Sequence, residues 1–468
     1  MQQLSNMDAT FLNLESKSTP MHIGCILQFS NPADGKMTFA RFKNHIASRL
    51  SISPVFRRKL ATLPLNVDLP YWVDDRTFSI DNHVKEHRIS AISSQTQRET
   101  MVDQFFSETL DPTIPLWEMR YVDMGNSFNV LMKFHHAALD GKAAEKILAG
   151  LLSPTSTSIE ADADSWTPAP PSYTQMTANK LRGLYRSPKK IAAFGKSLGH
   201  ALNNSYRLRQ RDRSHSTPPH FFLSPATSFN GEVKHSRRIR SAHLSLDKIK
   251  AIKSLYPGYT VNDVVLAICS GAVRQHLTNT NKLPNTPIVA MAPVSKRLDN
   301  TDGTGNSISA MLVSLATDID SATDRLHAIH RNAVQSKEYN KEVSMEEVIA
   351  HLPSWSSSLV VKAYTRLRIG KWLKPVFNMI ITNVPGSPVP LYLDGAKLKS
   401  MEGMAPIVDG MGLTMVVTSY LDTLTIAATT TIETAKESPD LAGYLQASLD
   451  ELYAAATADH PTQAVSGF

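Results

Sequence analysis

The stretch "PLWEMRYVDMGNSFNVLMKFHHAALDG", residues 115–141, decides the fold. It contains the pattern of a β-hairpin, and the second strand of that hairpin ends at two adjacent histidines. Apolar residues alternate on both sides of the Gly-Asn pair at 125–126, which is typical of two antiparallel strands joined by a tight turn. The start of the first strand then lies opposite the end of the second. We therefore expect "PLW" (115–117) to lie beside the histidine pair at 135–136.

A helix is predicted directly after this hairpin. Apolar residues at Ala143, Ala144, Ile147, Leu148, Leu151 and Leu152 follow helical spacing. Residues 135–141 are therefore expected to form a strand-to-helix loop.

Strands and helices alternate along the rest of the chain, which predicts an α/β fold. Residues 23–29 read as a strand, and residues 39–50 read as a helix capped by Thr38. In the C-terminal half, a helix is predicted from about Thr260, and strands are predicted around "TPIVAMAPV", "SISAMLVSLA", "VFNMIITNV", "LTMVVTSY" and "LTIAATTT".

The length of 468 residues, 42% of them apolar, indicates two domains of similar size. Residues 153–173 are rich in Ser, Thr, Pro and small acidic residues, as expected of a linker. We predict an N-terminal domain over 1–165, a linker with a basic helical segment over 166–225, and a C-terminal domain over 226–468.

The charge balance favours acidic partners. The 49 Lys and Arg exceed the 42 Asp and Glu, which gives a net charge of +7 and a pI of about 9.1. Phosphate-bearing ligands or anionic lipid surfaces fit this balance, whereas no motif for nucleic-acid binding accompanies it. The basic segment 179–213, which includes Arg207, Arg209, Arg211 and Arg213, is either a solvated helix face or a lipid-facing surface.

The cysteines and the N-terminus indicate a reducing, cytosolic setting. Cys25 and Cys269 lie far apart in apolar runs and are expected to be small buried residues. The first 20 residues lack the pattern of a signal peptide, and no run approaches the roughly 20 apolar residues of a membrane helix. Any membrane contact is therefore expected to be peripheral.

The loop "HHAALDG" has three interpretations. In the first it is structural: Asp140 caps the next helix, Gly141 eases the turn, and the histidines merely end a strand. A metal site is the second, but no further ligand motif such as HExxH or CxxC accompanies it. The third is general base catalysis, to which a neutral imidazole is well suited near neutral pH.

Two other motifs have structural and functional interpretations. "GKSLG" (195–199) fits the nucleophile elbow of lipases, with Ser197 as nucleophile, but the basic, helical residues before it are wrong for that context. Thr260 and Asp263 match a capping box that opens a helix, which explains Asp263 without any function. A capping box explains Asn262 less well, because the second helical position has no such requirement.

With these motifs in place, the chain resembles the bacterial wax ester synthase/diacylglycerol acyltransferase family. The resemblance extends over nearly the whole chain in order and spacing. It rests on "MDATFLNLE", "PMHIG", "PLWE", "HHAALDG", "SFNG" followed by "RR", "ND", "APVSKR", "GTGNSIS" and "TNVPGSP". Ser387 departs from the pattern, because many members have proline there, and the acidic linker is unusually long.

The resemblance implies a fold and an activity. The fold is a pair of chloramphenicol acetyltransferase-like α/β domains that form a pseudo-dimer around a central tunnel. The activity is transfer of a long-chain fatty acyl group from acyl-CoA to a fatty alcohol, giving a wax ester, or to diacylglycerol, giving triacylglycerol. Acyl-CoA is a co-substrate, and no cofactor or metal is implied. The protein would be cytoplasmic, with peripheral contact to the inner membrane face or to lipid inclusions.

The resemblance also implies roles for individual residues. His136 is the general base, no covalent acyl-enzyme forms, and His135, backbone N–H groups and Asn262 are candidate donors to the oxyanion. Gly141 allows close approach of backbone and substrate. The candidate substrate-binding residues are Pro115, Leu116, Trp117, Asn262 and Asp263.

Asp140 is expected to be structural and to pair with Arg297 of "APVSKR", which fixes the loop that carries His136. For Leu116 and Trp117, plain core packing remains an alternative. Two other functions remain open: a serine lipase or esterase that uses Ser197, and a lipid-droplet binding protein without turnover.

Overall fold

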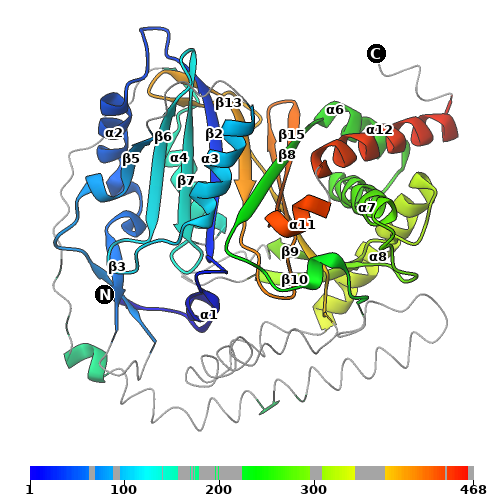
Figure 1. Ribbon diagram of the computed structural model, residues 1–468, viewed down its shortest axis with the longest axis horizontal. Coiled ribbons are helices and arrows are strands. Elements are labelled where there is room, and N and C mark those ends of the chain that lie inside the picture. Colours follow the sequence, from blue (N-terminus) through cyan, green and yellow to red (C-terminus); the bar gives the residue numbers. More distant parts are fainter. Residues whose placement is uncertain are drawn as a thin grey trace.

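The described part of the chain forms two six-stranded sheets and one three-stranded sheet, with helices packed against them. The structure is a computed structural model. It describes residues 1–62, 69–87, 95–139, 141–156, 224–295, 308–342, 375–437 and 440–461, together with 169, 172, 174–178, 195–196 and 199. The two large sheets lie side by side, and helix α1 lies at the lower end of strand β2 in the view of Figure 1. This architecture confirms the predicted α/β class.

The first large sheet has the strand order β12-β13-β2-β7-β6-β5. Its strands are β12 (Tyr392–Leu393), β13 (Ala396–Met404), β2 (His22–Ser30), β7 (Ser127–His135), β6 (Trp117–Asp123) and β5 (Val84–His87).

The second large sheet has the order β10-β9-β11-β14-β15-β8. Its strands are β10 (Ile308–Ser314), β9 (Val289–Ser295), β11 (Met379–Val384), β14 (Thr414–Tyr420), β15 (Thr423–Thr431) and β8 (Arg237–Ser245). The small sheet joins β1 (Gln2–Gln3), β4 (Tyr71–Asp74) and β3 (Arg58–Ala61).

The helices of the described ranges surround these sheets. They are α1 (Asn6–Leu14), α2 (Phe39–Ala47), α3 (Gln95–Ser107), α4 (Gly141–Leu151), α6 (Leu246–Leu255), α7 (Val261–Asn279), α8 (Ala322–Glu342), α11 (Ile432–Glu437) and α12 (Leu441–Asp459).

The predicted hairpin is confirmed. Strands β6 and β7 pair antiparallel, with Trp117 opposite Phe134, and Gly125 in the turn has a φ of 80°. Left-handed backbone of this kind favours glycine. The predicted caps are also present: the Thr38 side chain accepts the Arg41 N–H at the start of α2.

The two faces of the first sheet carry different cores. One face packs an apolar cluster that includes Trp117, Phe134 and Met132 against residues of α2 and α4. The other face packs Ile26 and Leu131 against α3. His135 follows Phe134 along β7, so its side chain lies on the α3 face.

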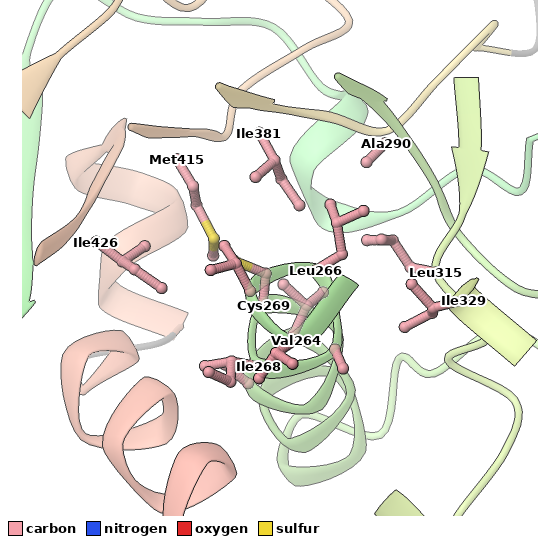
Figure 2. Close-up of a cluster of buried hydrophobic side chains, with 14 of the residues drawn as sticks. Val264, Leu266, Ile268, Cys269, Ala290, Leu315, Ile329, Ile381, Met415 and Ile426 are labelled. Carbon is pink, nitrogen blue, oxygen red and sulfur yellow. The ribbon is translucent and has the colours of Figure 1, made fainter. Parts of the chain in front are cut away.

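Helix α7 forms the centre of the second core. Val264, Leu266, Ile268 and Cys269 project from it among side chains of the second sheet and α8 (Figure 2). Each of these four side chains is almost fully buried. The helix predicted from about Thr260 is therefore a core helix, buried on all sides from residue 263 to residue 273.

The first sheet contains strands from both halves of the chain. Strands β12 and β13 come late in the sequence, yet β13 pairs with β2 of the first sheet, with Met401 opposite Leu27. The buried Arg237 at the start of β8 donates hydrogen bonds to the Ser18 and Lys234 carbonyls. The segment between α1 and β2 is thereby attached to the second sheet.

The cysteines and the lengths of the helices test two further predictions. Cys25 and Cys269 are both free thiols; Cys269 is buried as predicted, whereas Cys25 is only half-buried. Within the described ranges, every helix is too short or too polar to cross a bilayer. The basic segment 179–213 lies almost entirely outside the described residues, so its expected role stays a prediction.

Candidate active site

The histidine pair lies at the end of β7, where backbone hydrogen bonds fix both residues. The His135 N–H donates to the Leu116 carbonyl at 3.0 Å, and the His136 N–H donates to the Met21 carbonyl at 2.8 Å. "PLW" and the two histidines therefore meet in space, as the hairpin register predicts. His22 of β2 is the cross-strand partner of His135.

The His135 imidazole is completely buried, and its two nitrogens have different surroundings. Nδ1 accepts the Ala137 N–H at 3.0 Å. A nitrogen that accepts a hydrogen bond carries no proton, so the neutral ring has its hydrogen on Nε2. Nε2 lies 3.4 Å from Oε2 of Glu15, which follows helix α1.

The His136 imidazole is only half-buried, and an aromatic ring holds it from one side. The Phe11 ring of α1 stacks on it, with the ring centroids 3.9 Å apart and an interplanar angle of 8°. Of the two imidazoles, only that of His136 is partly exposed.

The loop continues into helix α4, which begins at Gly141 as predicted. Asp140 and its expected partner Arg297 both lie outside the described residues, so this pair stays a prediction. The Ala138 N–H donates to the His135 carbonyl at 2.9 Å. The N–H groups of the three successive residues 136, 137 and 138 therefore all donate within the protein.

The "PLW" motif is buried against the hairpin. Pro115 is buried, Leu116 is 2% exposed and Trp117 is 1% exposed. The indole Nε1–H of Trp117 donates to the Phe56 carbonyl at 3.0 Å, and its rings stack on His83 at 4.5 Å. In this arrangement "PLW" supports the strand end that carries His135, which fits the core-packing interpretation.

The "ND" motif opens α7, and Asp263 forms the predicted capping box with Thr260. The carboxylate of Asp263 accepts hydrogen bonds from the Thr260 N–H at 2.8 Å and from its hydroxyl at 2.9 Å. It also lies 3.1 Å from Nδ1 of His330 on α8. Asp263 is 2% exposed, and its contact with His330 joins α7 to α8. The adjacent Asn262 is half-buried.

The block "TNVPGSP" closes against the end of β14. The Gly386 N–H donates to the Ser419 hydroxyl at 3.1 Å, and a Cβ at position 386 would lie only 1.7 Å from the Ser419 carbonyl oxygen. Only glycine fits this close approach. The carbonyl of Ser387, which stands where many family members have proline, accepts the Leu421 N–H. Serine at position 387 is therefore compatible with the close approach of Gly386 to Ser419.

His22 is a buried titratable group beside His135. Its Nε2 donates to the Phe106 carbonyl at 3.0 Å. Burial, together with nearby Lys133, holds the pKa of His22 well below its usual value. His22 is therefore neutral at neutral pH.

The sequence does not predict Phe11, Glu15 or His22 as site residues. All three lie in the N-terminal blocks "MDATFLNLE" and "PMHIG", whose resemblance to a family is their only sequence signal. Among the described residues, no group of three or more His, Cys, Asp or Glu side chains forms a candidate metal site.

Two family models match the chain. The model for the wax ester synthase/diacylglycerol acyltransferase catalytic domain covers residues 4–265, and the model for the C-terminal domain covers residues 304–453. The chain belongs to the wax ester synthase/diacylglycerol acyltransferase family. It is accordingly an O-acyltransferase.

Curated relatives of this family resemble the chain along almost its full length. It is 32% identical to an O-acyltransferase from Acinetobacter baylyi over 91% of each sequence. It is 30% identical to a putative diacylglycerol O-acyltransferase from Mycobacterium tuberculosis over 96% of this chain and 99% of the relative.

Solved structures show the same fold. The wax ester synthase/diacylglycerol acyltransferase from Marinobacter aquaeolei superposes with a TM-score of 0.69 at 24% identity over 98% of this chain and 99% of that one. A trichothecene 15-O-acetyltransferase from Fusarium sporotrichioides gives 0.58 at 11% identity over 97% and 94%. The starter condensation domain of rhizomide synthetase, in complex with C8-CoA and Leu-SNAC, gives 0.55 at 12% identity over 97% and 94%. The predicted fold class is thus confirmed.

The structure leaves the nucleophile-elbow alternative untested at its proposed nucleophile. Gly195 and Lys196 are helical, as the basic pattern around them predicts, while Ser197 lies outside the described residues. The family assignment favours acyl transfer over a serine hydrolase.

Proposed function

We propose that the chain transfers a long-chain fatty acyl group from acyl-CoA to the hydroxyl of a fatty alcohol or of diacylglycerol, with His136 as general base. The observation that carries the proposal is the contrast between two adjacent imidazoles. His135 is fully buried and engaged at Nδ1, whereas His136 is half-buried and held by a stacked ring. A base must touch its substrate, so His136 is the better candidate.

The reaction needs one proton carrier. A ring nitrogen of His136 takes the hydroxyl proton as the hydroxyl oxygen attacks the thioester carbonyl carbon. The tetrahedral intermediate then collapses, the C–S bond breaks, and the imidazolium gives its proton to the departing CoA sulfur. No covalent acyl-enzyme is required.

The oxyanion of this intermediate needs hydrogen-bond donors. The N–H groups of residues 136, 137 and 138 already donate to Met21, His135 and the His135 carbonyl, respectively. Because His135 is buried, it is also poorly placed to touch substrate. Asn262 and backbone N–H groups elsewhere remain the candidates.

The substrates follow from chemistry and family names. The condensation domain that shares this fold was solved with C8-CoA, and the Acinetobacter relative is named an O-acyltransferase. The excess of Lys and Arg suits the CoA phosphates. Because water competes with the alcohol for the thioester, we infer that the acyl chain lies in an enclosed tunnel that excludes water.

A lipid-soluble acceptor also requires contact with membranes or lipid inclusions. We propose that the basic segment 179–213 supplies this contact through attraction to anionic headgroups. Neutralising Arg207, Arg209, Arg211 and Arg213 should weaken binding to anionic vesicles and reduce its salt dependence, while activity on a short soluble alcohol persists. Unchanged vesicle binding would favour a solvated linker.

An acceptor panel tests the proposed function. Purified protein is incubated with palmitoyl-CoA and either a long-chain alcohol, diacylglycerol or no acceptor, and free CoA and esters are measured. We expect CoA release that depends on the acceptor. Equal release without acceptor would indicate a hydrolase, labelling by a fluorophosphonate would point to Ser197, and no release would indicate a binding protein.

A further inference from the structure

We propose that Glu15 is a positioning residue: its single carboxylate fixes the backbone on both sides of the His136 imidazole. The inference rests on His136 as the base of the proposed function. Glu15 caps the C-terminal end of α1, where its backbone N–H donates to the Phe11 carbonyl.

One carboxylate oxygen acts through Met21. Oε1 accepts the Met21 N–H at 3.2 Å, and the Met21 carbonyl in turn accepts the His136 N–H at 2.8 Å. The His136 N–H is thus held by the carbonyl of Met21, a residue whose own N–H is held by Glu15.

The other oxygen acts through His135. Oε2 lies 3.4 Å from Nε2 of His135, a distance for electrostatic attraction without hydrogen-bond geometry, and Nδ1 of the same ring accepts the Ala137 N–H at 3.0 Å. A carboxylate beside Nε2 favours the tautomer that carries its hydrogen there. That tautomer leaves Nδ1 free to accept, as the Ala137 N–H requires.

The contacts through Met21 and those through His135 form a closed path around His136. They start at one carboxylate and end at the consecutive amides of His136 and Ala137. The Glu15 side chain is 22% exposed, so the contacts are largely sheltered from water, which would otherwise compete for them. The fully buried His135 completes the path without touching substrate.

Glutamine at position 15 should break this path. An amide carries no charge and has one oxygen acceptor and one NH2 donor, so if its oxygen accepts the Met21 N–H, its NH2 group faces the His135 Nε2–H in place of a carboxylate oxygen. Aspartate keeps two acceptors on a shorter stem. We therefore expect Glu15→Gln to lower kcat about tenfold with little change in KM, and Glu15→Asp to recover part of the loss.

The matched control is Asp8→Asn. It removes one negative charge from the first turn of the same helix, where Asp8 accepts a hydrogen bond from the Ser5 hydroxyl. Asp8→Asn reports any general effect of α1 on stability and should keep kcat within twofold of wild type. Thermal unfolding of both variants separates loss of fold from loss of positioning.

A spectroscopic measurement tests the proposal independently of activity. Nitrogen NMR of histidine-labelled protein should show His135 in one neutral tautomer with hydrogen on Nε2, and a mixed or changed tautomer in Glu15→Gln. An unchanged His135 spectrum together with near-wild-type kcat in Glu15→Gln would overturn the role of Glu15. If His136→Ala is inactive at the same time, only the Glu15 proposal fails; if His136→Ala is active, the proposed base fails.

Discussion

The Phe11 ring lies flat against the His136 imidazole, with centroids 3.9 Å apart and planes within 8° of parallel. This contact joins the N-terminal helix to the end of a strand 125 positions later in the chain. The helix that provides Phe11 also ends next to Glu15, so both histidines lie against the same short segment. We infer that α1 is part of the site.

Replacement of Phe11 tests this contact. A stacked aromatic pair contributes about 0.5–1.5 kcal/mol beyond its buried area. If that energy orients the base, Phe11→Ala should lower kcat by roughly threefold to tenfold, whereas Phe11→Tyr should retain most activity. Steady-state kinetics with acyl-CoA and a soluble alcohol measure the effect. A Phe11→Ala variant with unchanged kcat and normal unfolding would show that the stack does not orient His136.

Asp263 is predicted to act on stability. Asp263→Ala removes the carboxylate that completes the capping box with the N-cap Thr260, together with the contact to His330, and loss of helix capping costs about 0.5–2 kcal/mol. We expect a lower unfolding free energy in urea and a kcat per folded molecule close to wild type. A variant of normal stability with a strongly reduced kcat would instead restore Asp263 as a substrate-binding residue.

Trp117 offers a second test of structural support. Trp117→Ala removes a buried indole that packs on Phe56 and His83 and should cost about 3–5 kcal/mol. Trp117→Phe keeps a ring but leaves the Phe56 carbonyl without its N–H donor, and should cost about 1–3 kcal/mol. Thermal unfolding gives the ranking. A stable Trp117→Ala protein with a raised KM for the alcohol would contradict core packing.

Stability should fall as the pH drops below about 6.5. Burial lowers the pKa of His22, His45 and His83 in the folded chain. Between each lowered pKa and the unfolded value near 6.5, the unfolded chain binds more protons, so acid favours unfolding. Each such histidine contributes up to about 1.4 kcal/mol per pH unit in that window.

Urea unfolding at pH 7, 6 and 5 measures this dependence. His83→Gln keeps a donor for the Trp117 carbonyl, which His83 Nδ1 contacts at 2.9 Å, but removes a titrating group. Its stability should therefore depend less steeply on pH than that of wild type. His235→Gln changes an exposed histidine and serves as the control. Equal slopes in wild type and His83→Gln would exclude His83 from the effect.

Local sequence patterns predict much of the fold. The hairpin register follows from alternation around Gly125, and the start of α7 follows from the Thr260–Asp263 capping box, because both depend on residues close in sequence. The pairing of β13 with β2 joins residues more than 350 positions apart. Alternation shows that a strand forms but carries no information about such a distant partner.

The candidate site is predictable only in part for the same reason. His136 and its neighbours lie in a compact motif whose composition is unusual. Phe11 and Glu15 reach the histidines only after α1 folds across the strand ends, and a phenylalanine or glutamate in a short helix has no local pattern that reveals such a contact. His330 likewise meets Asp263 only because α8 packs beside α7.

The most direct test of the central claim is the rate of acyl transfer by His136→Ala, measured with palmitoyl-CoA and a long-chain alcohol. Loss of a general base typically lowers kcat by about 10²–10⁴. We predict a loss of this size with an unfolding midpoint close to wild type, because the half-buried ring contributes little to the core. A correctly folded His136→Ala protein that forms ester at nearly the wild-type rate would contradict the assignment of His136 as the base.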